Sequence, residues 1–300
     1  MNTSGINPYF ALWFGVVSLS TSAILVKFST APSGVIAFYR LFFSVILMLP
    51  LFLHKYIPEL KKISFKDWIH TIIAGVFLAF HFILWFESLN YTSVASSTVL
   101  VTLQPIFAFV GSYFIFHERF SNKAIFSCVI TILGSVLISW GDFYVSGTAL
   151  YGDILALIAC SLVTFYFMFG QSVRKRVSLI TYTFVVYSIS SIVLFLYVVI
   201  RGEPLIPYNS FNWTMFILLA IFPTLLGHSI INWSLKWLKT STVSMAIVFE
   251  PVGSAIMAYF FFQENVIWTQ VLGGLIVLGG IMLFSMDERK MKNENKMRLD

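Results

Sequence analysis

Residues 99–118 read VLVTLQPIFAFVGSYFIFHE, and residues 245–264 read MAIVFEPVGSAIMAYFFFQE. Each stretch is apolar and contains about the 20 residues that a helix needs to cross a bilayer core roughly 30 Å thick. Each also carries one polar residue directly before a proline, in the pairs Gln104-Pro105 and Glu250-Pro251. A shift of 146 residues superposes the two stretches and aligns these pairs. We therefore predict two related membrane-spanning segments, one in each half of the chain.

The composition of the whole chain is typical of a membrane protein. Apolar residues make up 58% of the 300 residues and charged residues only 11%, against roughly 25% charged residues in soluble proteins. Lipid offers no partner for an unpaired backbone group, so the apolar runs are expected to be helices. We predict an all-α integral membrane protein whose ten transmembrane helices cover 9–28, 34–53, 68–88, 93–116, 122–140, 151–170, 179–200, 211–233, 241–262 and 266–286.

The two halves of the chain are expected to form an inverted repeat. The 146-residue shift also places Glu118 on Glu264 and Gly134 on Gly280. Each half holds five predicted spans, an odd number, so the halves enter the membrane in opposite orientations, as in many secondary transporters. We predict a first five-helix repeat over 1–143, a second over 144–287, and a basic tail over 288–300.

The basic residues predict the orientation in the membrane. If the N-terminus is cytoplasmic, sixteen of the 19 Lys and Arg residues fall in loops or a tail on the cytoplasmic side. Such a bias is the usual positive-inside pattern. We predict a multi-pass protein of the plasma membrane with both termini in the cytoplasm. The net charge of +6 is then a topology signal, and no nucleic-acid partner is predicted.

Several of these segments resemble a known family, the EamA branch of the drug/metabolite transporter superfamily. In the first half the resemblance is carried by Tyr39-Arg40 and by residues 96–105 (SSTVLVTLQP), which lead to Glu118. In the second half it is carried by residues 228–236 (HSIINWSLK), Glu250-Pro251 and Glu264.

The resemblance implies a ten-helix carrier of small metabolites, often an exporter, whose helices line a central cavity. It covers nearly the whole chain, but it does not identify the substrate. The second half has Val186-Tyr187 where the first has Tyr39-Arg40. The resemblance therefore supplies no symmetric partner for Arg40.

Polar residues within the spans are the candidate substrate-binding or coupling residues, because ionisable groups at membrane depth are costly. Gln104 and Glu250 are the sharpest pair. Pro105 and Pro251 lack an N–H, so each leaves a carbonyl of its helix without a partner and is a candidate helix break. Glu250 is the candidate proton carrier, because removal from water favours its neutral form. The alternative is that both prolines only kink packed helices.

The other candidate site residues lie in three further spans. Arg40 keeps its charge and needs an anionic or carbonyl partner, either a substrate group or an internal carboxylate such as Glu87 or Glu250. The spacing of His228 and Asn232, and that of His81 and Trp85, places each pair on one helix face. Packing without substrate contact is the alternative for these four residues. The last candidate, from the resemblance, is Tyr39.

We predict a secondary transporter that moves a small organic metabolite by alternating access around a midplane cavity. We expect an exporter of amino acids or related compounds, with proton coupling left open. The chain has no ATP-binding P-loop, and no cofactor or metal motif is evident. The alternatives are a membrane-embedded enzyme, for which no catalytic motif is found, and a channel. The partners expected are the substrate and the lipid bilayer, and monomer and homodimer both remain open.

Overall fold

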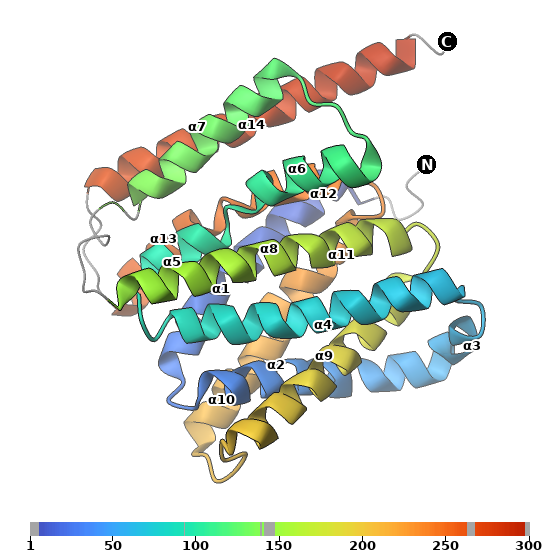
Figure 1. The fold of residues 1–300 in the computed structure, drawn as a ribbon, viewed down its shortest axis with the longest axis vertical. Coiled ribbons are helices and arrows are strands. Elements are labelled where there is room, and N and C mark those ends of the chain that lie inside the picture. The colour runs from blue at the N-terminus through green and yellow to red at the C-terminus, as the bar shows by residue number, and fades with distance from the viewer. Residues whose placement is uncertain (1–5, 93, 139, 141–147, 263–267, 298–300) are drawn as a thin grey trace.

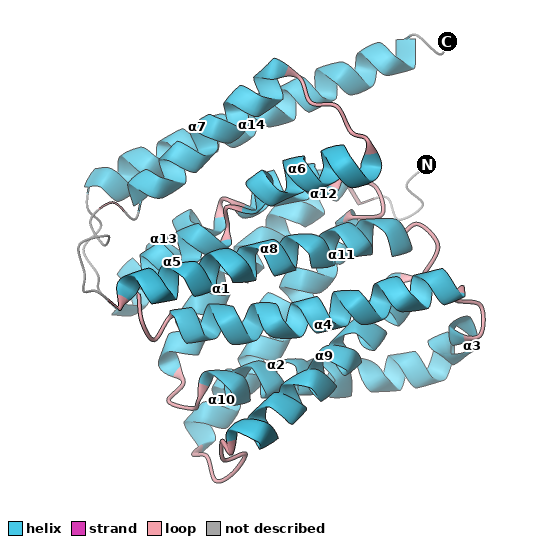
Figure 2. Ribbon diagram, viewed as in Figure 1, coloured by secondary structure: helices cyan, strands magenta, loops and turns pink. Residues whose placement is uncertain are grey.

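The computed structural model describes residues 6–92, 94–138, 140, 148–262 and 268–297. Every regular element in these ranges is a helix (Figure 2). The α-helices are α1 (Pro8–Phe28), α2 (Ser33–Leu51), α3 (Ile57–Leu60), α4 (Phe65–Ser88), α5 (Val94–Val101), α6 (Gln104–Phe116), α7 (Asn122–Ile138), α8 (Ala149–Val173), α9 (Leu179–Arg201), α10 (Ser210–Leu219), α11 (Ser229–Ser234), α12 (Thr240–Ile247), α13 (Glu250–Phe262) and α14 (Trp268–Met297).

The predicted membrane fold is confirmed. Nine helical stretches of the described residues are long and apolar enough to cross a membrane, and the apolar helix Asn122–Leu137 is shorter. Together these are the ten predicted membrane helices. The predicted repeat boundary at 143/144, the matched Glu264, and the last residues of the predicted tail lie outside the described residues.

Two membrane helices contain π-helical segments that the sequence analysis did not predict. Helix α2 has Pro50 in its last turn and continues through the π-helical segment Phe52–Tyr56 into α3. The predicted loop 54–67 is therefore partly helical. A second π-helical segment, Ala220–His228, contains Pro223 and joins α10 to α11. Because proline has no N–H to donate, the helix has to rearrange around it, and π-bulges are one way of doing so.

The last helix is longer than its predicted span of 266–286. It runs on to Met297, through most of the predicted basic tail. Residues 287–297 contain several Glu, Lys, Arg and Met residues, which favour helix, and neither Gly nor Pro. The sequence therefore gives no signal that would end the helix at the membrane surface.

In Figure 1, α4 and α8 run side by side, other helices cross them obliquely, and α7 and α14 form a pair along one edge of the bundle. Glycines allow the two helices of this pair to approach closely. A Cβ added to Gly134 would lie 2.9 Å from the backbone oxygen of Gly273, and one added to Gly280 would lie 3.1 Å from that of Ser127. Small residues serve this purpose in membrane helix pairs.

The equivalent membrane helices of the two halves are interrupted at equivalent places. Helix α5 ends at Val101 and α6 begins at Gln104, while α12 ends at Ile247 and α13 begins at Glu250. In both cases the new helix has its proline at the second position, where a missing N–H costs nothing. The interruptions therefore place Gln104 and Glu250 at the starts of helices within the membrane.

Candidate functional site

A small cavity lies where six membrane helices meet. Its volume is about 20 Å³, which is room for about one water molecule. Its lining residues are Leu19, Ser22, His81, Trp85, Val101, Gln104, Val163, Phe167, His228 and Glu250. The fold thus brings five of the candidate residues, from both halves of the chain, to one place.

The helix interruptions account for the position of two of these residues. Gln104 and Glu250, the first residues of α6 and α13, are only 4% and 5% exposed. In an uninterrupted helix the preceding turn would cover the helix start. Here the break exposes it to the cavity, and the partial positive charge of a helix N-terminus favours anionic groups.

Arg40 is fully buried beside this cavity. Its Nε donates to Thr224 Oγ1 at 2.7 Å, and its Nη1 donates to Ser22 Oγ at 2.8 Å. The guanidinium also lies 4.2 Å above the ring of Phe82, a favourable cation–π arrangement. Since Ser22 lines the cavity, Arg40 stands one side chain behind its wall.

The expected carboxylate partners of Arg40 form no close pair with it. Within the described residues, no carboxylate oxygen lies within 4.0 Å of its nitrogens. Glu87 instead accepts hydrogen bonds from Asn90 and Tyr91 near the end of α4. Glu250 is close enough to attract the guanidinium electrostatically. The Arg40 guanidinium therefore contacts only neutral groups at close range, two hydroxyls and an aromatic ring, and can still pair with an anionic ligand.

Aromatic rings and two histidines form much of the remaining wall. His81 contacts the backbone oxygen of Ala159 through Nδ1 at 2.9 Å and stacks on Trp85, with 5.8 Å between ring centres. His228 stacks on Phe167 at 6.0 Å. These contacts fix the rings at the cavity edge.

Five candidate residues each keep a buried polar atom without a hydrogen-bond partner among the described residues. These atoms are Arg40 Nη2, Trp85 Nε1, Gln104 Oε1, His228 Nδ1 and Asn232 Oδ1. Buried polar atoms are nearly always paired in folded proteins, so unpaired ones require an explanation. Trp85, Gln104 and His228 line one cavity, and Arg40 lies directly behind its wall, which favours a binding site there.

Two further candidate residues, like Arg40, do not line the cavity. Asn232 donates to the Tyr166 hydroxyl and to the backbone oxygen of His228. Tyr39 points away from the cavity, where its hydroxyl donates to the backbone oxygen of Leu205 at 2.9 Å. Asn232 thus joins α11 to α8, and Tyr39 joins α2 to the loop after α9.

The sequence analysis missed Ser22 and Thr224, the two hydroxyls that hold Arg40. A weak signal exists for Thr224, since it follows Pro223 within the π-helical segment. That segment displaces the backbone so that the Thr224 hydroxyl donates to Leu219, five residues back, and accepts from Arg40. No comparable signal marks Ser22.

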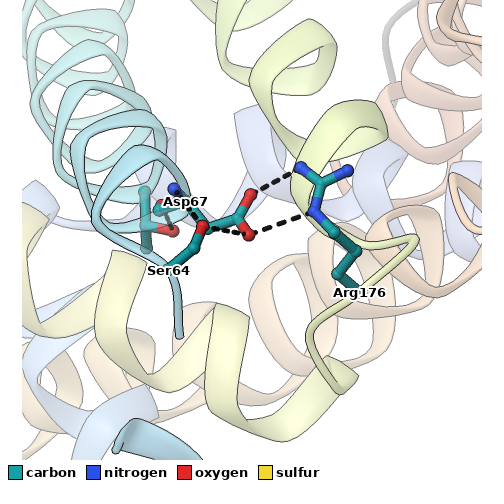
Figure 3. Close-up of polar contacts among 4 residues, drawn as sticks. Ser64, Asp67 and Arg176 are labelled. Carbon is teal, nitrogen blue, oxygen red and sulfur yellow. Dashed lines mark hydrogen bonds and ion pairs between the residues drawn. The ribbon is translucent and has the colours of Figure 1, made fainter. Parts of the chain in front are cut away.

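Ionic contacts join the two halves at one end of the bundle (Figure 3). Arg176, in the loop after α8, donates to both carboxylate oxygens of Asp67 at 2.5 and 3.0 Å, and Ser64 donates to the same carboxylate at 2.8 Å. The bond to Asp67 raises the pKa of Arg176 above its usual value. Glu59 accepts from the backbone N–H of Ser178 at 2.7 Å. We call the Asp67–Arg176 pair the latch.

The opposite end of the bundle also carries contacts between the two halves. Ser29 donates to the Asn212 side chain at 2.8 Å. A cavity of about 270 Å³ lies beside this contact, and Phe86 forms part of its lining. The ring of Phe86 lies 5.9 Å from the Arg40 guanidinium. This cavity and the central one share no lining residue, so the two are separate.

The comparisons with known proteins agree with this architecture. A model of the EamA-like transporter family matches residues 7–140 and again 150–286. A solved crystal structure aligns with a TM-score of 0.77 over 95% of this chain and 98% of the other, at 16% identity. At that identity the likeness supports the fold alone.

Relatives are found among curated transporters. The uncharacterized transporter YxxF of Bacillus subtilis is 26% identical over 231 residues, covering 74% of this chain and 71% of YxxF. A protein of Rickettsia bellii named S-adenosylmethionine uptake transporter is 25% identical over 295 residues, covering 93% of this chain and 94% of its own. The two family matches together span most of the sequence. The chain therefore belongs to the EamA-like transporter family and is a multi-pass membrane transporter, not an enzyme.

Proposed function

We propose that this transporter is a secondary carrier of amino acids or amino-acid derivatives, which bind at the central cavity and cross by alternating access. The observation that carries the proposal is a set of four unpaired polar atoms at one buried cavity, three on lining residues and the fourth on Arg40 directly behind the wall. The cavity of about 20 Å³ corresponds to an occluded conformation without substrate. Binding then requires the helices around it to separate.

The chemistry of the unpaired atoms supports this substrate class. Arg40 Nη2 and Trp85 Nε1 are hydrogen-bond donors and require an acceptor such as a carboxylate oxygen. Gln104 Oε1 is an acceptor and requires a donor such as an ammonium group. An α-amino acid carries both groups on one carbon. Glu250, on the same wall, offers the ammonium group a carboxylate.

The name of the Rickettsia relative is compatible with this class. S-adenosylmethionine retains the α-amino and α-carboxyl groups of an amino acid. That name specifies uptake, whereas we propose export from the cytoplasm. Transport into and out of vesicles is therefore measured separately.

We also propose that both termini lie in the cytoplasm, at the end that carries the latch. Most basic loop residues belong to the segments that meet at this end, and Tyr9 of α1 and Met291 of α14 line one cavity there. Cytoplasmic loops of membrane proteins are enriched in Lys and Arg.

Proton coupling through Glu250 is the last part of the proposal. A carboxyl group that is buried in the membrane, near Arg40, can bind and release a proton as access alternates. The purified protein is reconstituted in liposomes and supplied with a panel of radiolabelled amino acids and S-adenosylmethionine. Accumulation driven by a pH gradient is compared with substrate counterflow, which needs no net proton movement.

Glu250→Gln is expected to abolish accumulation driven by the pH gradient and to retain counterflow. Asp153→Asn is the matched control, because Asp153 does not line the cavity. Its carboxylate accepts a hydrogen bond of 3.0 Å from Ser96. Normal gradient-driven transport by Glu250→Gln refutes the coupling. Absence of both activities in the wild-type protein for every compound refutes the substrate class.

A further inference from the structure

A second cavity in the structure is larger than the central one. A cavity of about 310 Å³ lies where the α6–α7 loop, the α11–α12 loop and the last turns of the membrane part of α14 meet. It shares no lining residue with the central cavity. Beneath it lies a separate apolar cluster of Ala124, Cys128, Met245 and Phe284. The cavity therefore has an apolar floor, and its volume is typical of small-molecule sites.

Two carboxylates lie on one wall of this cavity, from consecutive residues of α14. Asp287 accepts a hydrogen bond from Ser121, and Glu288 accepts one from Thr242 at 2.7 Å. Within the described residues neither forms an ion pair shorter than 4.0 Å. The second oxygen of Glu288, Oε2, is buried and has no hydrogen-bond partner there. The two carboxylates therefore lack a positively charged N–H donor as a partner among the described residues.

The lining also contains two cations, from the α6–α7 and α11–α12 loops. These are Arg119 and Lys239. Lys239 lies 3.7 Å from Glu118, which already compensates its charge. Arg119 thus offers a planar guanidinium to an anionic group. Between the charged residues, Phe120 and Trp237 supply aromatic surface.

We propose that this cavity binds a zwitterion in which a primary ammonium group lies close to an anionic group. The ammonium group lies against Asp287 and Glu288, where it satisfies the free oxygen of Glu288. The anionic group lies against Arg119. The carbon skeleton rests on the aromatic walls and the apolar floor. This inference goes beyond the proposed function and does not depend on it.

Two sources supply this chemistry. One is the headgroup of an aminophospholipid, since the cavity lies among loops at the end of a membrane bundle. The other is a free amino acid in the cytoplasm. Both place an ammonium group within a few bonds of an anion, so the experiment has one arm for each.

Binding is measured on the purified full-length protein in detergent, by isothermal titration calorimetry. The probes are glycerophosphoethanolamine, as the soluble lipid headgroup, and serine, as the free amino acid. Glycerophosphoglycerol, which has the anionic group but no ammonium group, is the specificity control. The variants are Asp287→Asn/Glu288→Gln and Arg119→Gln, and Asp153→Asn is the matched control.

We expect wild type and Asp153→Asn to bind at least one zwitterionic probe and not glycerophosphoglycerol. Each cavity variant should bind that probe about tenfold more weakly or worse, as expected for loss of a charged hydrogen bond. Preference for glycerophosphoethanolamine identifies the lipid source, and preference for serine the free amino acid.

The proposal is overturned if wild type binds neither zwitterion, if glycerophosphoglycerol binds equally well, or if the cavity variants bind like wild type. The two variants alter different elements of the lining, α14 and the α6–α7 loop. Should one of them fail to fold, the other and the selectivity of wild type still decide the question.

Discussion

Asp67→Asn should loosen the latch that joins the two halves at one end of the bundle. The Asp67 carboxylate receives two hydrogen bonds from Arg176 and one from Ser64. Asparagine has nearly the same shape but no charge, and it replaces one acceptor oxygen with an NH₂ group. That group would face a donor of Arg176, so one bond is lost and the other loses its ionic character.

The size of the effect follows from the burial of the two partners. The Asp67 side chain is 4% exposed, whereas that of Arg176 is 51% exposed. Hydrogen bonds to charged groups contribute about 1.5–3 kcal/mol, and solvent screening of an exposed partner reduces this toward the values for surface pairs. We therefore expect a loss of about 1–2 kcal/mol, which corresponds to a factor of roughly 5–30 between closed and open forms.

A cysteine placed behind the latch reports the change in the ratio of open to closed forms. Thr71 is 2% exposed and lies one helical turn beyond Asp67, to whose backbone oxygen it donates at 2.6 Å. In a background of Cys128→Ala and Cys160→Ala, Thr71→Cys should react with a water-soluble thiol reagent in proportion to the open fraction. Asp67→Asn should accelerate the reaction by roughly the factor given above.

A double-mutant cycle supplies the control for this prediction. Arg176→Gln should accelerate labelling to a similar extent, and the double variant should add little to either single one, because both remove the same interaction. Glu87→Gln, at the opposite end, should leave the rate unchanged. Equal labelling rates for wild type and Asp67→Asn would show that the pair does not hold this end closed.

Three further predictions concern the binding site, the helix pair and pH. Arg40→Lys should weaken substrate binding about tenfold, because lysine cannot reproduce the planar fork of donors; unchanged affinity in a binding titration would exclude contact with an anionic group. Gly280→Ala should lower the free energy of unfolding by about 1–3 kcal/mol, because the added Cβ overpacks against Thr131. Gly279→Ala, whose added Cβ meets nothing within 4 Å, should be neutral in the same melting assay. Burial raises the pKa of Glu118 above its usual value. Its contribution to stability is therefore present below that usual pKa and is lost as pH rises through the folded-state pKa. Between acidic and neutral pH the melting temperature should fall less for Glu118→Gln than for wild type, and identical pH profiles would contradict this.

The fold was largely predictable because the bilayer imposes strong rules on sequence. Long apolar runs, the bias of basic residues and the paired prolines each reflect one physical requirement of a spanning helix. Local departures were not predictable. Pro50 and Pro223 are followed or enclosed by π-helical segments, whereas Pro105 and Pro251 stand at the starts of new helices. The surrounding packing decides between these outcomes.

The candidate site was predictable only for residue types that are rare in membranes. Glutamate, histidine and arginine within a span stand out, since each is costly there. Serine and threonine do not stand out, because their hydroxyls can donate hydrogen bonds to backbone oxygens of their own helix. Ser18 and Ser20 donate to backbone oxygens four residues back, while Ser22 in the same run accepts from Arg40. Nothing in the sequence separates these three serines.

The two halves share a backbone device but differ in its chemistry. The helix interruption recurs at equivalent places, yet the residue it presents is an amide at Gln104 and a carboxyl at Glu250. Arg40 likewise has no counterpart in the second half, where the 146-residue shift places Val186. The hydroxyl of the neighbouring Tyr187 contacts Ser229 at 3.0 Å. A symmetric backbone suits two conformations that are open to opposite sides of the membrane. Asymmetric side chains around the same cavity provide one titratable acid and one permanent cation. The repeated backbone can therefore support the movement, while the differences between the halves set the chemistry of what is moved.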